Sequence, residues 1–428
     1  MKNLVIIGGG FAGATLAKKV QCRLPPEWNI YLLSETNFVT YYPLLPEVVG
    51  ASVLPGHIQA PLRQIARHAR IRMVKVDNID FEQKKVFYHN NEAGELPFDQ
   101  LVFAAGVRAN TNMMPGMQEY ALPLKTVGDA LYIRNQMIDR MEQATIHPEP
   151  YHRKHLTTFI VIGGGFSGVE TAGELDDFLK AAVHYYKNVR LEDCRVILLH
   201  SGDRLLPEIS EKLGRKTERE FKKRHIEVRL NTRALRIEAD RVILDNGEAI
   251  TAGTIICTIG TLPHGFIQND ALPRERGKIK TQGDMSVTGM NGIWALGDCA
   301  LVPNARDGKF CPATAQFADR QARFLAKNIA ASVRGKTTRN FSFRPIGLMA
   351  STGHNKAVAE IYCFRISGLV GFLLWRAAYL IKVPTLARKV RLYLEWTWAM
   401  FFPPDIAHLG FKRTEPDATA SNIEVDNH

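Results

Sequence analysis

Two glycine-rich turns of the same spacing constrain the fold of this 428-residue chain more than any other feature. The first turn, Gly8-Gly9-Gly10-Phe11-Ala12-Gly13, follows an apolar run at 4–7 and precedes a helical pattern at 14–20. A second apolar run at 30–33 then ends at Ser34-Glu35. In G-x-G-x-x-G the glycines permit the tight turn, the approach of a pyrophosphate and close helix–strand packing. The segment therefore predicts a dinucleotide-binding βαβ unit, in which Glu35 accepts hydrogen bonds from ribose hydroxyls.

The same pattern recurs about 155 residues later in the chain. Gly163-Gly164-Gly165-Phe166-Ser167-Gly168 follows the apolar run 159–162, and helical and apolar patterns at 169–187 and 196–199 lead to His200. A carboxylate at that strand end would repel the 2′-phosphate of NADPH, whereas His200 and the nearby Ser201 and Arg204 would not. His200 could equally pack on adenine or bond a 2′-hydroxyl. We therefore expect this second site to accept NADH or NADPH.

Two dinucleotide sites suggest a flavin beside a nicotinamide. Asp298 follows the apolar run 293–296 and could bind the ribityl hydroxyls of FAD. A helix predicted over 313–332 would direct its N-terminus at the flavin pyrimidine and stabilise negative charge there. The candidate FAD ligands are Gly8, Gly10, Phe11, Ala12, Gly13, Glu35, Ala105, Gly106, Gly297, Asp298, Ala315 and Gln316. The candidate NAD(P)H ligands are Gly163, Gly165, Phe166, Ser167, Gly168, Glu170, His200, Arg204 and Gly260.

These patterns predict an α/β fold with two Rossmann-like dinucleotide-binding domains, for FAD and NAD(P)H, and a C-terminal amphipathic helical segment for membrane association. The expected boundaries place the FAD domain in two parts, with the NAD(P)H domain inserted between them. The boundaries are 1–112 and 261–340 for FAD, 113–260 for NAD(P)H, 341–413 for membrane association or dimerisation, and 414–428 for a disordered acidic tail.

The positive charge of the chain, +12 in total, gathers near its C-terminus, where residues 363–413 hold eight bases and two acids. On a helical wheel of 386–402, one side holds Leu386, Val390, Tyr393, Leu394 and Phe401, and the other holds Arg388, Arg391 and Glu395. Such a helix suits an anionic membrane surface, although a dimer-forming or core-capping helix pair would need an apolar face too.

Other classes of protein are excluded by the sequence. No apolar run approaches the ~18–20 residues of a membrane span, and no secretory signal is present, so we expect a peripheral protein on the cytoplasmic side. The basic cluster lacks a nucleic-acid recognition motif. Six scattered cysteines without a C-x-x-C pair argue against a zinc site or a dithiol centre, and no metal is expected.

The chain resembles the type II NADH dehydrogenases, non-proton-pumping NADH:quinone oxidoreductases among the two-dinucleotide-binding-domain flavoproteins. The resemblance spans most of the chain and is most specific in the motifs at 8–13 with Glu35, 42–47 (YPLLPE), 115–126 (PGMQEYALPLKT), 163–170 (GGGFSGVE), 295–300, 312–316 and 394–406. It implies that Glu170 assists hydride or proton transfer where nicotinamide and flavin meet. From its position alone, Glu170 is a carboxylate in the first turn of a helix.

The resemblance also implies a quinone site, with Gln316 as a catalytic residue, and a homodimer. The family motif Ala-Gln-x-Ala-x-Gln matches at Ala315, Gln316 and Ala318, but Arg320 replaces the second glutamine. Lys356 corresponds to a lysine that the family places near the acceptor, although it could be an ordinary surface lysine. Arg320 therefore leaves the identity of the acceptor open.

The function expected from the sequence is transfer of hydride from NAD(P)H to FAD and then of two electrons to a membrane quinone, without proton pumping. Three alternatives stay open: a flavin reductase serving a soluble electron carrier, a sulfide:quinone oxidoreductase, and a non-catalytic flavoprotein.

Overall fold

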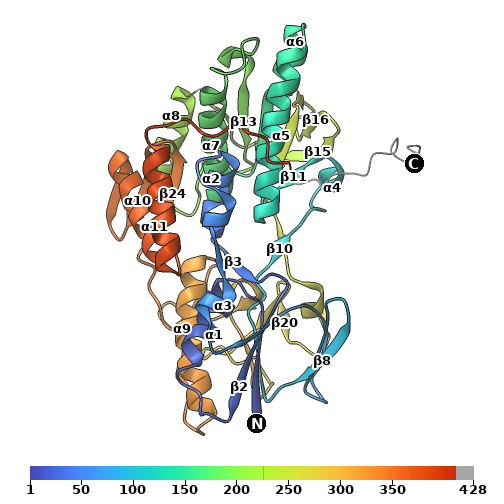
Figure 1. The fold of residues 1–428 in the computed structure, drawn as a ribbon, viewed down its shortest axis with the longest axis vertical. Coiled ribbons are helices and arrows are strands. Elements are labelled where there is room, and N and C mark those ends of the chain that lie inside the picture. Colours follow the sequence, from blue (N-terminus) through green and yellow to red (C-terminus); the bar gives the residue numbers. More distant parts are fainter. Residues whose placement is uncertain (225, 411–428) are drawn as a thin grey trace, which may run out of the picture.

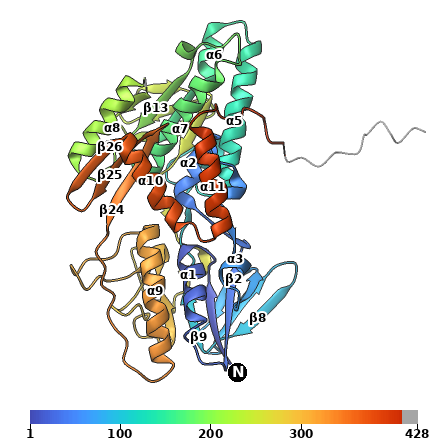
Figure 2. The same cartoon turned by 60° about the vertical axis from the view of Figure 1, so that its left-hand side comes forward.

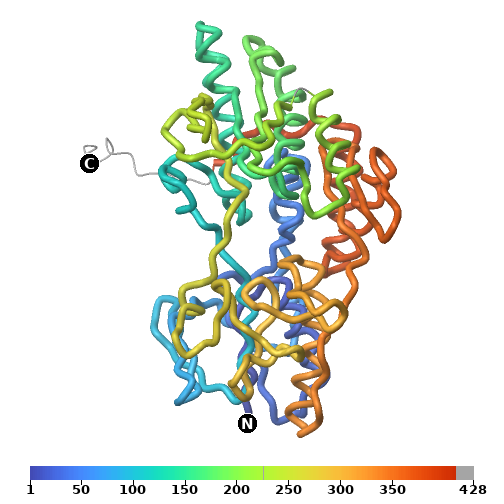
Figure 3. The backbone as a smooth tube through the Cα atoms, turned by 180° about the vertical axis from the view of Figure 1, so that it is seen from behind, coloured from blue at the N-terminus to red at the C-terminus, as the bar shows by residue number. Residues whose placement is uncertain are grey.

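The computed structural model describes residues 1–224 and 226–410. The chain forms an elongated molecule in which one lobe contains the N-terminus and the other contains the middle of the sequence (Figure 1). Seen from behind, segments near residues 110 and 260 run between the lobes (Figure 3). There the short strands β10 (Arg108–Ala109) and β19 (Thr261–Leu262) pair antiparallel. The acidic tail expected at 414–428 lies outside the described residues.

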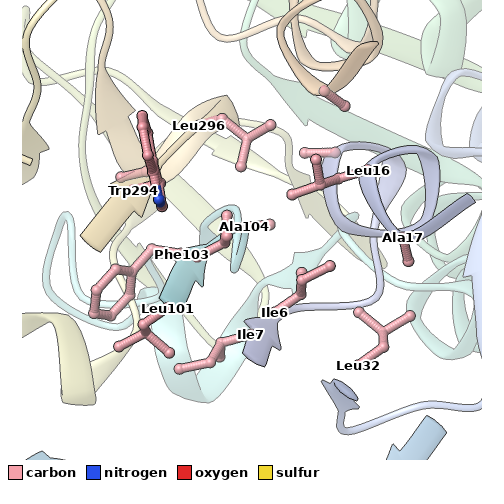
Figure 4. Packing of buried hydrophobic residues seen from close by; sticks show 14 of the residues in the cluster. Ile6, Ile7, Leu16, Ala17, Leu32, Leu101, Phe103, Ala104, Trp294 and Leu296 are labelled. Atoms are coloured by element: carbon pink, nitrogen blue, oxygen red, sulfur yellow. The ribbon is translucent and has the colours of Figure 1, made fainter. Parts of the chain in front are cut away.

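The first lobe is built on a parallel five-stranded sheet. Its order is β22 (Ile293–Ala295), β9 (Gln100–Phe103), β1 (Lys2–Ile7), β2 (Trp28–Ser34) and β5 (Arg70–Met73). The central strands β1, β2 and β9 contain continuous apolar runs because both faces of the sheet are buried there, whereas the edge strand β5 is partly exposed. Figure 4 shows side chains such as Ile6, Phe103 and Trp294 in one hydrophobic cluster with Leu16 of α1 (Phe11–Val20). The strand contributed by residues 293–295 means that this sheet is completed late in the sequence.

The second lobe repeats the plan. Its sheet has the order β11 (Leu122–Pro123), β18 (Thr254–Cys257), β12 (Thr158–Ile162), β13 (Arg195–Leu199) and β14 (Ile226–Arg229), and it is also parallel. The helices of this lobe include α5 (Val127–Ile146), α7 (Phe166–Ala182) and α8 (Glu211–Lys223). Helices α1 and α7 begin inside their glycine turns, at Phe11 and Phe166, earlier than the apolar patterns predicted. The predicted α/β fold with two Rossmann-like units is confirmed.

Smaller elements complete the two lobes. They are β3 (Phe38–Thr40), α2 (Leu45–Val49), β4 (Gln59–Pro61), α3 (Leu62–Ile65), β6 (Lys75–Asp80), β7 (Lys85–His89), β8 (Ala93–Pro97), α4 (Met117–Tyr120), α6 (Pro150–Leu156), β15 (Ala234–Glu238), β16 (Arg241–Leu244), β17 (Ala249–Thr251), β20 (Arg274–Glu275), β21 (Lys278–Lys280), β23 (Ala300–Leu301) and α9 (Ala315–Ser332).

The C-terminal part adds the antiparallel sheet β24 (Gly347–Gly353), β25 (Lys356–Ile361) and β26 (Phe364–Gly368), followed by α10 (Leu369–Lys382) and α11 (Leu386–Ala399). Strand β24 packs on α7, and the two helices lie along the side of the molecule next to both lobes (Figure 2). Among the described helices, none is long and apolar enough to cross a membrane.

The side of α11 that faces the protein differs from the one that the helical wheel suggested. Leu392 and Trp396 are 0% and 2% exposed, whereas the predicted apolar side, including Leu386 and Leu394, faces outward. Glu395, placed on the polar side by the wheel, is turned inward, where its carboxylate contacts the His57 ring and accepts a hydrogen bond from the N–H of Leu54. Partners in the segment that follows α2, far away in the sequence, therefore set the orientation of this helix.

Candidate active site

A cavity of about 2120 Å³ lies between the two lobes and the C-terminal part. Its lining comes from the first glycine turn, the start of α7, the N-terminus of α9, strand β24 and helix α10. Of the candidate FAD ligands, Gly8, Gly10, Phe11, Ala12, Glu35, Ala105, Gly106, Gly297, Asp298, Ala315 and Gln316 all line it. Gly13 sits behind it, in the contact between α1 and the turn. Widely separated parts of the sequence thus share one space.

The first turn fits a dinucleotide pyrophosphate. Gly8 has φ +107°, and a Cβ there would lie 2.4 Å from the carbonyl oxygen of Ala104. A Cβ on Gly13 would lie 1.8 Å from the carbonyl oxygen of Gly8, so helix and turn pack at a distance that only glycine allows. No side chain among the described residues caps α1 at Gly10, which leaves the first N–H groups of the helix for an anion.

The second turn has the same geometry. Gly163 has φ +123°, and a Cβ on Gly168 would lie 1.7 Å from the carbonyl oxygen of Gly163. Phe166, Ser167, Glu170 and Gly260 line the cavity, and no side chain of the described residues caps α7 at Gly165, the residue before its start. The second turn therefore also offers free helix N–H groups to an anion.

The pairing register corrects the equivalence assumed for His200. Ile7 pairs with Leu33 in the first sheet and Ile162 pairs with Leu199 in the second. His200 is therefore equivalent to Ser34, and Ser201, not His200, is equivalent to Glu35. Counting residues from the end of each apolar run would have given this register, because the last residues of the two runs, Leu33 and Leu199, pair with the residues just before the glycine turns.

His200 is turned toward its own glycine turn. Its Nδ1 accepts a hydrogen bond from the N–H of Gly164 (3.2 Å), which requires that nitrogen to be unprotonated. Burial lowers the pKa of the imidazole, in agreement with a neutral ring. Arg204 donates to the carbonyl oxygen of Pro207 (3.0 Å). Within the part of the chain that the structure describes, neither His200 nor Arg204 lines the cavity.

The flavin end of the cavity contains Asp298, with Lys125 and Tyr42 beside it. Burial raises the pKa of Asp298, which the charge of Lys125 opposes. Lys125 Nζ lies 5.5 Å from the centre of the Tyr42 ring. Thr314 caps α9 by accepting from the N–H of Phe317, which leaves the first two N–H groups of the helix for a ligand. Lys125 was missed as a site residue, although it lies within the 115–126 motif.

Because α7 begins at Phe166, Glu170 is the fifth residue of the helix and lies just past the first turn, in which the sequence had placed it; the residue is 6% exposed. Its Oε1 accepts a hydrogen bond from the N–H of Ser351 (3.0 Å), which leaves Oε2 to hold a proton. Burial raises the pKa of Glu170 to about 8, with a further contribution from nearby Glu47. Glu170 is therefore protonated at neutral pH, and a neutral carboxyl gains little from the helix dipole.

Glu47 on α2 is a second buried carboxyl near this end. Burial raises its pKa to about 7, which the hydrogen bond from Trp396 Nε1 to its Oε2 (2.8 Å) opposes. Trp396 belongs to α11, so this bond ties the C-terminal helix to α2, which packs against α5 and α7 of the second lobe. Sequence reasoning did not identify Glu47, because its partner is 349 residues away.

The acceptor end of the cavity contains Gln316 and Arg320 of α9 and Lys382 of α10. Lys382 was not predicted, although it interrupts an apolar stretch just before Pro384. Lys356, which was predicted here, lies elsewhere: its Nζ donates to Glu220 Oε2 (3.0 Å). The structure therefore brings Lys382, rather than Lys356, to this end of the cavity.

Comparison with known proteins gives two family matches. Residues 2–322 match the family described as Pyridine nucleotide-disulphide oxidoreductase, and residues 346–404 match the NDH2 C-terminal domain. Among solved structures, NDH2 from Plasmodium falciparum in complex with NADH superposes with a TM-score of 0.87 at 18% identity, covering 95% of this chain and 99% of that one. This likeness describes the fold.

Curated relatives are similar along nearly the whole chain. A probable NADH dehydrogenase of Dictyostelium discoideum is 28% identical over 417 residues, covering 95% of this chain and 91% of the relative. The type II NADH:quinone oxidoreductase Ndh of Mycobacterium tuberculosis is 27% identical, covering 92% and 87%. The demethylphylloquinone reductase NdbB of Synechocystis is 29% identical, covering 92% and 95%.

Proposed function

Because the chain belongs to the pyridine nucleotide-disulphide oxidoreductase family and has an NDH2 C-terminal domain, we propose that it oxidises NAD(P)H with FAD and reduces a quinone. The relatives named NADH dehydrogenase and NADH:quinone oxidoreductase, which match over almost their full lengths, support this function. No proton pumping is part of the proposal.

One observation supports the proposal above the others. A single cavity is lined by the first glycine turn, by the start of α7 after the second turn, and by the N-terminus of α9. A flavin held by the first turn and a nicotinamide held by the second would therefore meet in the same space, beside an apolar end lined by β24 and α10. Such proximity is what hydride transfer between two bound cofactors requires.

We assign a binding role or a proton-holding role to each of these residues. Gly8, Gly10 and Gly13 hold the pyrophosphate of FAD, Glu35 its ribose and Asp298 its ribityl chain. When bound, FAD supplies the ring that accepts hydride from the nicotinamide and returns electrons to the acceptor. Glu170 holds a proton at Oε2, where the nicotinamide half of the cavity meets the flavin half.

Gln316 has its Oε1 occupied by the N–H of Ile346 (3.2 Å), so its Nε2 is left to donate a hydrogen bond. We assign Gln316 and Lys382 to the acceptor carbonyls, with Arg320 next to them. The apolar lining at this end, which includes Leu348, Met349 and Tyr379, would exclude water around the acceptor ring.

We also propose peripheral attachment to an anionic membrane surface on the cytoplasmic side. The outward side of α10 and α11 exposes a set of large apolar residues: Leu369, Val370, Leu373, Ile381, Leu386, Val390, Tyr393, Leu394 and Trp398. Arg388, Lys389 and Arg391 lie in the same stretch of α11, and each base near an anionic surface contributes roughly 1 kcal/mol. A homodimer is the other arrangement that could cover this side, and sedimentation velocity of the detergent-free protein tests it.

Stepwise anaerobic reduction tests the function. NADH is added to the purified yellow protein, and a quinone follows after the absorbance of the flavin has bleached. Bleaching followed by recovery of the absorbance is expected. Gly165→Val is the matched variant, because bulk at the second turn blocks the nucleotide while leaving the first turn intact, so this protein should stay yellow.

The same assay separates the alternatives. Recovery with a ferredoxin but not with a quinone would indicate a soluble electron carrier, and bleaching by sulfide would indicate a sulfide:quinone oxidoreductase. A sulfide enzyme would need a cysteine pair, whereas all six cysteines, each within the described residues, are free. A protein that binds FAD but neither bleaches nor recovers would be a non-catalytic flavoprotein.

A further inference from the structure

The side chains of Gln316, Arg320 and Lys382 at the acceptor end of the cavity all offer hydrogen-bond donors. Gln316 is left with its Nε2, because its oxygen is used by Ile346. Across residues 1–224 and 226–410, neither the guanidinium of Arg320 nor the ammonium of Lys382 has a hydrogen bond or an ion pair with a protein group. Each instead lies over an aromatic ring: Arg320 is 5.3 Å from the centre of Phe343, and Lys382 is 5.6 Å from that of Tyr379.

Neither of these two cations forms an ion pair with an acid of the described residues. Asp319, the nearby acid, is already paired with Arg323 Nε (2.8 Å) and accepts from Thr15 Oγ1 (3.3 Å). Lys389, a further base in the lining, donates to the carbonyl oxygen of Ile381 (2.9 Å). Within residues 1–224 and 226–410, the positive charges of Arg320 and Lys382 therefore remain unpaired at this end of the cavity. Glu170, the buried acid of the adjoining nicotinamide end, is protonated and carries no charge that could pair with them.

We propose that the acceptor subsite takes a quinone bearing an ionised acidic substituent, such as the anion of a hydroxyquinone, and that Arg320 selects it. The proposal deepens the proposed function and rests on it. A planar ring would lie along the apolar lining of Ile346, Leu348 and Tyr379, with its anionic oxygen toward the guanidinium. The remaining carbonyl would accept hydrogen bonds from Gln316 and Lys382.

The state of Lys382 agrees with a subsite that lacks its counter-ion. Burial lowers the pKa of this lysine, the charge of Asp319 opposes this, and the like charge of Arg320 adds a smaller lowering. An anion bound between the two cations would relieve this repulsion. A neutral quinone would accept the same hydrogen bonds but would not gain from the charge.

Two quinones with the same ring system provide the test: 1,4-naphthoquinone, which is neutral, and 2-hydroxy-1,4-naphthoquinone, which is ionised at neutral pH. The holoenzyme is assayed for kcat/KM with each quinone, and binding of each to the oxidised holoenzyme is measured by equilibrium dialysis, which does not depend on the redox potential of the quinone. The ratio of anionic to neutral affinity is compared in wild type, Arg320→Gln, Arg320→Lys and Arg344→Gln.

Arg320→Gln should lower this ratio about tenfold, which corresponds to about 1.4 kcal/mol. Arg320→Lys should retain most of it, because the charge is kept. Arg344→Gln is the matched control: Arg344 lies 5.5 Å from the centre of the Tyr362 ring, two residues from the lining residue Ile346, and its loss should leave the ratio unchanged. Raising the ionic strength should reduce the ratio in wild type more than in Arg320→Gln.

An unchanged ratio in Arg320→Gln would overturn the inference while leaving the proposed function intact. A wild type that binds and reduces neither quinone would overturn the proposed function itself. If Arg320→Gln instead weakened binding to anionic vesicles and left the ratio as in wild type, the arginine would serve a lipid phosphate, and the selection of an anionic quinone would be refuted.

Discussion

Replacing Glu170 by glutamine removes one titrating proton from the buried end of the cavity and keeps the shape of the side chain. The amide oxygen of glutamine can still accept the hydrogen bond from the N–H of Ser351. The variant should therefore fold and bind FAD, whereas its stability should respond differently to pH. Reduction of the acceptor should slow by about 10²–10⁴, the usual contribution of a positioned proton donor.

The size of the pH effect follows from the pKa of Glu170, which burial raises to about 8. A carboxyl with a raised pKa stabilises the fold at low pH and loses this contribution as the pH rises through the folded pKa. Between pH 6 and pH 9 the loss is about 3 kcal/mol. For a chain of 428 residues the unfolding entropy is about 0.9 kcal/mol per kelvin, so Tm should fall by about 3 °C.

The assay is apparent Tm of the FAD-bound protein from pH 6 to pH 9 at a fixed scan rate. The pKa of Glu47 and that of Glu174 are also raised by burial, but wild type and Glu170→Gln both contain these two groups. The difference between the Tm curves of wild type and the variant therefore reports mainly on Glu170. Wild type should lose about 3 °C more than Glu170→Gln over this range. Parallel curves would refute the conclusion that Glu170 is protonated at neutral pH.

Three further variants test other parts of the site and its surroundings. Glu35→Arg should lower FAD occupancy, measured as the ratio of flavin to protein absorbance, because a cation replaces the acceptor for the ribose hydroxyls. Leu394→Glu should weaken sedimentation with anionic vesicles severalfold, because this 60% exposed leucine lies on the outward side of α11. Wild type should use NADH and NADPH within about tenfold in kcat/KM, and Ser201→Glu should shift preference toward NADH about tenfold, since position 201 aligns with Glu35.

Each of these variants has a contrary outcome. Full FAD occupancy in Glu35→Arg would contradict the assignment of the first turn to FAD. Tyr132→Glu is the control for Leu394, since Tyr132 is 59% exposed on α5 in the second lobe, and equal losses in the two variants would contradict docking through α11. A shift in nucleotide preference with His200→Glu but none with Ser201→Glu would contradict the register-based equivalence.

The two nucleotide units could be predicted from sequence because their determinants are local. A turn that needs φ near +107° at Gly8 and contact without a Cβ at Gly13 specifies glycine at fixed spacing, whatever the rest of the chain does. The strands before these turns end in unbroken apolar runs, at 4–7 and 159–162, because both faces of a parallel sheet are covered. The fold class and the pair of cofactors follow from these features together.

The orientation of α11 and the identity of the acceptor-end lysine could not be predicted in the same way. A helical wheel gives the period of apolar residues but not the partner that buries one side, and here the partners of Glu395 and Trp396 lie 338 and 349 residues away. Likewise Lys356 and Lys382 are both lysines near the C-terminus. Only the tertiary arrangement, in which β25 lies beside α8 and α10 lines the cavity, separates an ion pair with Glu220 from a place in the cavity.

The late position of β22 determines the order in which the lobes can form on the ribosome. β9 ends at Phe103, and its outer neighbour does not emerge until Ile293–Ala295, after a delay of about 10–40 s at ordinary synthesis rates. The second sheet needs only residues between Leu122 and Cys257, so it can close first. Until β22 has been made, β9 is an unpaired edge strand of the first sheet. Such an edge can pair with other chains, and a chaperone would have to shield it. The residues that we propose for FAD extend to the start of α9, so under that proposal the flavin site is complete only after Gln316 has been made.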